Sequence, residues 1–91
     1  MKITKEQEEQ IINFGVFGYS EKKIANILGV DVTEVSKDIK NENSDLFKLL
    51  EKGKDMSDYV IDLKLFEMAK SGDIKALDKL QHRKALREID F

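Results

Sequence analysis

Residues 19–40 have the sequence YSEKKIANILGVDVTEVSKDIK, which predicts two short helices joined by a tight turn. Ser20 is a favourable N-cap residue for the first helix. The residues that form its apolar face are Ile24, Ala25 and Leu28. Gly29 follows the last of them, where a helix commonly ends in the left-handed conformation that glycine adopts without strain.

The second helix of this stretch is expected to begin after Asp31, and Glu34 three residues later completes a capping-box pattern. Because successive residues are 100° apart around a helix, its residues fall on two faces. The predicted buried face comprises Val32, Val35 and Ile39. The predicted outward face comprises Thr33, Ser36, Lys37 and Lys40.

A helix, a glycine turn and a second helix, with the small Ala25 allowing a close crossing, resemble the DNA-binding helix-turn-helix of many bacterial and phage proteins. The resemblance is carried by IANILGVDVTEVSKDIK, residues 24–40. It implies that the second helix lies in the major groove of double-stranded DNA and that the first crosses the backbone. The expected contacts to base edges or phosphates come from Thr33, Ser36, Lys37 and Lys40. The expected contacts to the flanking backbone come from Ser20, Lys22 and Lys23. The alternative is a helical hairpin that touches no nucleic acid.

The composition favours an all-α protein with one small domain and a helical extension. The chain has 91 residues, 37% of them charged, with no Pro, Trp or Cys. Without Cys there is no disulfide framework, thiolate nucleophile or zinc ribbon, which fits a reducing cytoplasm. The N-terminus has no apolar signal region and no long apolar run follows, so we expect no membrane segment and no export.

The charge balance is unfavourable for a single DNA-binding copy. The formal net charge is −2. Residues 1–44 carry six Lys against eight acidic residues. Because non-specific DNA affinity grows with the number of phosphates neutralised, one copy should bind weakly. Either several copies act together or the partner is not DNA.

Two domains are expected along the chain. Thr4 and Gln7 form a capping box for a first helix that runs to about Val16 and completes a three-helix domain. The polar segment 41–44 marks the boundary. We therefore expect a helix-turn-helix DNA-binding domain over residues 1–43 and a helical hairpin, with a role in oligomerisation, over residues 44–91.

Residues 45–70 predict either one long helix or two helices broken at Gly53. A heptad-like seam comprises Leu46, Leu49, Gly53, Met56, Val60 and Leu63. Two later apolar stripes comprise Ile61, Leu65 and Met68 on one side and Tyr59, Leu63 and Phe66 on the other. A helix that is apolar on two sides must be covered twice. The second cover is either the core of the same chain or a neighbouring subunit.

The segment 71–73 predicts a connection into a last helix that runs from Ile74 to about Arg87. The residues expected to face inward are Ile74, Leu77 and Leu80. A possible secondary basic stripe comprises Lys75, Lys79, Arg83 and Arg87. Such a stripe is either a solvated face or a contact surface for phosphates or an acidic protein. For the apolar residues of the end, 88–91, a frayed tail or a docking peptide is expected.

The second half has a narrower resemblance. Phe47, Leu50 and Lys54, followed by DLKLFEMAKSGDIKAL at residues 62–77, resemble phage terminase small subunits of the helix-turn-helix type, and the likeness covers residues 4–87. It implies a non-enzymatic subunit that recognises viral DNA as a ring-like homo-oligomer in the cytoplasm of a bacterial host and delivers it to the terminase large subunit. The chain departs from the family in having no Pro after Asn41 and no long C-terminal segment for docking the motor subunit.

No pattern for catalysis or for a cofactor is present in the sequence. Gly15 and Gly18 have no following Lys-Ser/Thr, so they do not form a phosphate-binding loop. His82 is the sole His and is expected on the surface. Asp55 and Asp58 do not form a metal-binding pattern. We therefore expect neither an enzyme nor a metal site. The remaining alternatives are a small dimeric helix-turn-helix transcriptional regulator and a helix-turn-helix module that binds protein.

Overall fold

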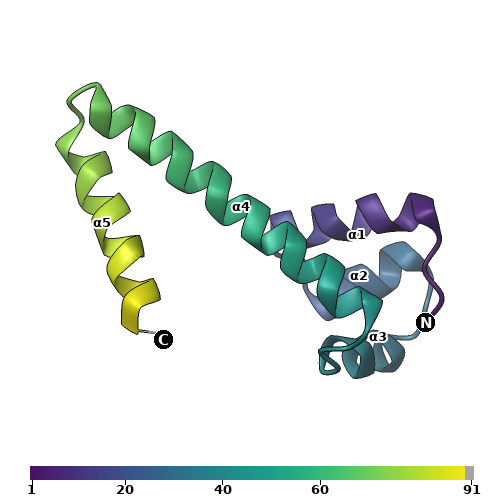
Figure 1. The fold of residues 1–91 in the computed structure, drawn as a ribbon. Helices are drawn as coiled ribbons and strands as arrows, with labels where there is room; N and C mark the ends of the chain where they lie inside the picture. The colour runs from purple at the N-terminus through teal and green to yellow at the C-terminus, as the bar shows by residue number, and fades with distance from the viewer. Residues whose placement is uncertain (90–91) are drawn as a thin grey trace. The chain divides into compact units, whose positions relative to one another are not determined.

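The computed structural model describes residues 1–89, which form five helices and no strand. The helices are α1 (Lys5–Phe17), α2 (Glu21–Leu28), α3 (Val32–Ile39), α4 (Asp45–Lys70) and α5 (Ile74–Ile89) (Figure 1). The all-α prediction is confirmed. The chain divides into two compact units, Met1–Ser57 and the residues from Asp58 onward, and the division falls inside α4. Residues 90 and 91 of the predicted tail lie outside the described residues.

The first two helices begin and end where the sequence predicts. The Thr4 hydroxyl accepts a hydrogen bond from the backbone N–H of Gln7 at 3.2 Å, and the Gln7 side chain accepts one from the N–H of Thr4 at 3.0 Å. These two bonds are the predicted capping box. The Ser20 hydroxyl caps α2 by accepting from the N–H of Lys23 at 3.2 Å, and Gly29 ends α2 with φ 70°.

The start of α3 differs in one detail from the prediction. Asp31 is the N-cap, and its carboxylate accepts a hydrogen bond from the backbone N–H of Thr33 at 3.2 Å. The predicted reciprocal bond from Glu34 is replaced by an ion pair, because the Glu34 carboxylate lies 3.7 Å from the amino group of Met1. The same amino group lies 3.5 Å from the carboxylate of Asp38. The acidic side of α3 thus faces the first residue of the chain.

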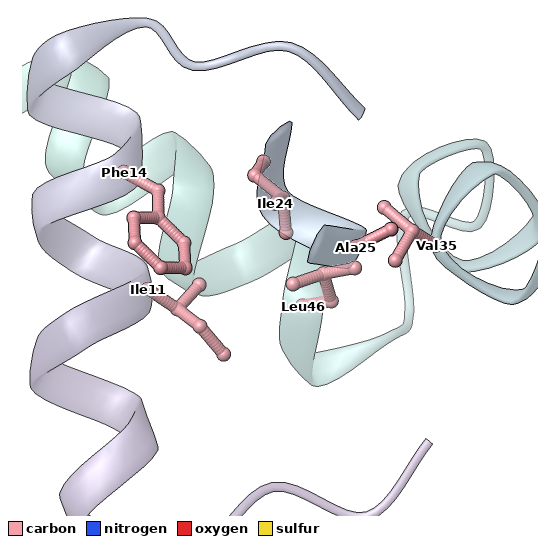
Figure 2. Packing of buried hydrophobic residues seen from close by; sticks show 6 residues of the cluster. All are labelled: Ile11, Phe14, Ile24, Ala25, Val35 and Leu46. Carbon is pink, nitrogen blue, oxygen red and sulfur yellow. The ribbon is translucent and has the colours of Figure 1, made fainter. Parts of the chain in front are cut away.

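The first unit has one hydrophobic core, to which α1, α2, α3 and the start of α4 all contribute (Figure 2). The buried side chains are Ile11, Phe14, Ile24, Ala25, Val35 and Leu46. Ile24 and Ala25 confirm the predicted apolar face of α2. Val32 was expected in the core, but 42% of its surface is exposed, because the first position of α3 lies at the edge of the buried face.

The first unit is longer than the predicted 43-residue domain. The Ser44 hydroxyl donates to the carbonyl oxygen of Asp38 at 2.6 Å and accepts from the N–H of Phe47 at 3.1 Å, so it caps α4 and joins it to the end of α3. Leu46 is then only 1% exposed within the core. Residues 41–44 are therefore a turn inside the first unit, and the division of the chain falls after Ser57.

Of the two arrangements open for residues 45–70, the structure has a single helix of 26 residues. Gly53 does not break it and is buried. The heptad-like seam is covered only in its first half, since Met56, Val60 and Leu63 are 48%, 62% and 40% exposed. Neither α4 nor any other helix within residues 1–89 has both the length and the apolar character needed to span a lipid bilayer.

The second unit contains the last part of α4 and α5. Gly72 makes the predicted turn with φ 103°, and the Asp73 carboxylate caps α5 by accepting from the N–H of Ala76 at 3.1 Å. The prediction that Ile74 and Leu77 face inward is wrong, since they are 72% and 41% exposed. Among the side chains of residues 74–88 of α5, Ala76 is the buried one, at 2% exposure. The unit therefore has very little core of its own.

Candidate nucleic-acid interface

The residues of α3 fall on three sides of the helix. Val35, fully buried, and the half-buried Ile39 lie against the core. Glu34 and Asp38 are paired with the amino group of Met1. The third side carries the four residues predicted to contact DNA, Thr33, Ser36, Lys37 and Lys40. Glu34 and Asp38 thus lie on a different side of α3 from Lys37 and Lys40.

Lys37 and Lys40 are the charged residues of this third side, and both are exposed. Within residues 1–89 neither ammonium group has a carboxylate within ion-pair distance. Thr33 is also exposed, whereas Ser36 is half-buried. The third side of α3 is therefore a positively charged surface with two hydroxyl groups, which is the chemistry that phosphates and base edges bind.

The predicted contacts at the start of α2 are also at the surface. Ser20, Lys22 and Lys23 are exposed. The Ser20 oxygen already caps α2, so its hydroxyl hydrogen is the group left to donate to a phosphate. Together with the first N–H groups of α2, these side chains form a site suited to an anion.

Tyr19 is a residue of this surface that the sequence analysis missed. The Lys23 ammonium lies 4.2 Å from the centroid of the Tyr19 ring. That ring stacks at 5.7 Å on Phe14 of the core and lies 5.4 Å from Phe17. The cation–π contact therefore connects Lys23 to the buried part of the unit. The signal in the sequence was an aromatic residue four positions before a lysine at a helix start.

Two of the four residues of the secondary basic stripe on α5 form ion pairs with carboxylates of α4. The Arg83 guanidinium lies 2.7 Å from the Asp62 carboxylate and 3.3 Å from that of Asp58, and Arg87 lies 2.7 Å from Asp62. Both arginines thus hold α5 against α4. Lys75 and Lys79 remain exposed. The expected continuous stripe of four cations is reduced to two lysines.

These ion pairs shift two pKa values. Partial burial would raise the pKa of the Asp62 carboxyl, but the hydrogen bonds from Arg83 and Arg87 outweigh it and hold that pKa below its ordinary value. The hydrogen bond to Asp62 raises the pKa of Arg83. The spacing offered a signal that the sequence analysis missed, because Asp58 and Asp62 are four residues apart, as are Arg83 and Arg87.

The second unit also has an open groove of about 580 Å³ between α4 and α5. It is lined by the apolar Ile61 and Leu65 of α4 and by polar residues of α5, which are Asp78, Lys79, His82 and Arg83. Elsewhere on the last part of α4, Tyr59 and Phe66 are 66% and 48% exposed. The second unit therefore exposes apolar surface that a further protein surface could cover.

Comparison of the chain with protein-family models, with curated proteins and with solved structures found no match.

Proposed function

We propose that this chain is a non-enzymatic, DNA-recognition subunit that binds double-stranded DNA as a homo-oligomer, with α2 and α3 acting as a helix-turn-helix. By its resemblance to phage terminase small subunits, its role would be to recognise viral DNA and to deliver it to the terminase large subunit. That subunit would supply the ATPase and nuclease activities.

The observation that carries the DNA-binding part is the division of α3 into three sides. Its two exposed lysines lie on a side without carboxylates, while Glu34 and Asp38 both lie within ion-pair distance of the single amino group of Met1. In a helix-turn-helix, the second helix enters the major groove and the start of the first helix meets the backbone. The exposed Lys22 and Lys23 at the start of α2 fit that second contact.

Self-association is supported by the second unit and by the net charge. Two helices held by ion pairs and by one buried alanine leave many large apolar side chains in water. Burial of that surface between copies would stabilise both helices. The chain has a net charge of −2, so the weak DNA contacts of one copy need reinforcement. Linking several copies raises the overall affinity by a factor of roughly 10² to 10⁴.

The test is the native mass of the full chain by light scattering, with and without random-sequence duplex DNA. We expect an oligomer larger than a dimer that binds DNA, with an affinity that falls steeply as salt rises. A dimer that selects a palindromic site would favour a transcriptional regulator. An oligomer that does not shift duplex DNA at low salt would contradict DNA recognition and favour a module that binds protein.

A further inference from the structure

Val32 is the exposed apolar residue of α3 and lies at the edge of the face that packs on the core. It is the first residue of α3, directly after the N-cap Asp31, and 42% of its surface is exposed. It lies one helical turn before Ser36 and next to Thr33, so it adjoins the side of α3 that carries the two lysines. Covering the exposed part of this side chain with an apolar partner would lower the free energy.

We infer that Val32 is a specificity-determining residue that contacts the C5-methyl group of thymine in the major groove. This inference rests on the proposed DNA-binding function, and it adds the base that the protein selects. Residues at the start of a recognition helix are the ones that reach base edges. The thymine methyl is the apolar group that the major groove presents, and apolar side-chain groups such as the methyl groups of Ala and Thr contact it.

The neighbours of Val32 have chemistry that selects bases less sharply. The hydroxyl groups of Thr33 and Ser36 both donate and accept hydrogen bonds, so they fit several base edges. The ammonium groups of Lys37 and Lys40 suit phosphates, which are the same at every step of the duplex. Val32 makes no hydrogen bond through its side chain, so only an apolar group on the DNA gives it a favourable contact. Thr33 also carries one methyl group, but Val32 carries two and has no competing polar atom, so we assign the thymine methyl to Val32.

The experiment compares two duplexes that differ only in this methyl group, alternating poly(dA-dT) and alternating poly(dA-dU). Removal of one contacted methyl group should weaken the binding free energy by about 0.8 kcal/mol, which is roughly a fourfold change in affinity. We expect the full-length protein to bind the thymine polymer at least fourfold more tightly. Val32→Ala should bind the two polymers nearly equally. Ile27→Ala is the matched control, because Ile27 is a β-branched residue of the same unit with a similar exposed fraction of 44%, but it lies on α2.

The possible results separate the inference from the proposed function. A thymine preference that is equally strong in the original protein and in Val32→Ala would come from the shape of the duplex, and it would overturn the inference. The inference would also be overturned if neither protein preferred the thymine polymer. If the protein binds neither polymer nor random duplex DNA, the DNA-binding proposal itself fails. Should circular dichroism show that Val32→Ala is unfolded, Val32→Ser is the second variant, because it removes both methyl groups at this exposed position. It is expected to show a reduced preference, and an undiminished one would overturn the inference.

Discussion

Gly15 of α1 and Gly53 of α4 face each other where the two helices cross. A Cβ atom added to Gly15 would lie 3.1 Å from the Cα of Gly53 and would collide with the carbonyl oxygen of Leu50. A Cβ atom added to Gly53 would collide with the carbonyl oxygen of Ile12. The obstacle is backbone in both cases, so it cannot be relieved by a side-chain rotation. The two glycines therefore set how closely α1 and α4 approach.

Gly53→Ala is expected to destabilise the first unit by about 1–3 kcal/mol, because the added methyl forces α4 away from the backbone of α1 at Ile12 and Val16. The sign of this change in the free energy of unfolding is informative, since Ala in place of Gly inside an unhindered helix stabilises the protein by about 1 kcal/mol. Chemical denaturation monitored by circular dichroism measures the change. Asn26→Ala, at an exposed position of α2, is the control and should not destabilise. A Gly53→Ala variant as stable as the control would show that the helices do not cross this closely.

The ends of the helices are the part of this fold that the sequence predicts best, because each helix end depends on a few neighbouring residues. Thr4 with Gln7, Ser20 and Gly29 all have the predicted capping roles. The sequence leaves open whether residues 45–70 form one helix or two, because a glycine inside a helix indicates either a break or a close crossing. Only the position of α1, far away in the sequence, decides between them.

The errors concern residues whose burial depends on a second helix. Val32 and Ile74 both occupy the first position of their helix, so periodicity assigns them to a face while tertiary packing leaves them at its edge. The first unit extends to Ser57, beyond the boundary predicted at residue 43, and Leu46 belongs to its core. For the candidate site, helical periodicity predicts which residues of α3 share one side. The ion pair between Arg83 and Asp62 cannot be predicted from one helix alone, because it depends on the contact between α5 and α4.

Replacing Lys37 and Lys40 together with Ala should weaken DNA binding similarly for all sequences. Each lost phosphate contact reduces the magnitude of the slope of log affinity against log salt by about 0.9. For the double variant, the magnitude of this slope should therefore fall by up to about 1.8. Fluorescence anisotropy over a salt series measures this slope. Lys54→Ala is the control, because Lys54 is also an exposed lysine of the first unit but lies on α4. Equal slopes for the double variant and the control would place the DNA contact elsewhere.

Asp62→Asn should lower the stability of the second unit in a pH-dependent way. The pKa of Asp62 is below its ordinary value of 3.8, so its ion pairs stabilise the folded state above that pH, and the contribution is lost as pH falls through the lower folded-state pKa. Because the pair is partly exposed, about 1 kcal/mol or less is expected at pH 7. Thermal unfolding of both proteins between pH 7 and pH 2 should show melting curves that converge in acid. Asp55→Asn, at an exposed position of α4, should show no such effect.

Replacing Tyr59 and Phe66 with Asp should dissociate the proposed oligomer without unfolding the first unit. Both side chains are exposed in the single chain, at 66% and 48%, so the chain itself loses little packing. In an oligomer that buries them, two carboxylates in an apolar contact would each be costly. Light scattering should then give the mass of one chain, and DNA affinity should fall by the factor that linked copies supply, roughly 10² to 10⁴. Lys64→Asp changes the charge of an already polar position on the same helix and should leave the mass unchanged. An intact oligomer in the double variant would exclude this face of α4 as the contact between copies.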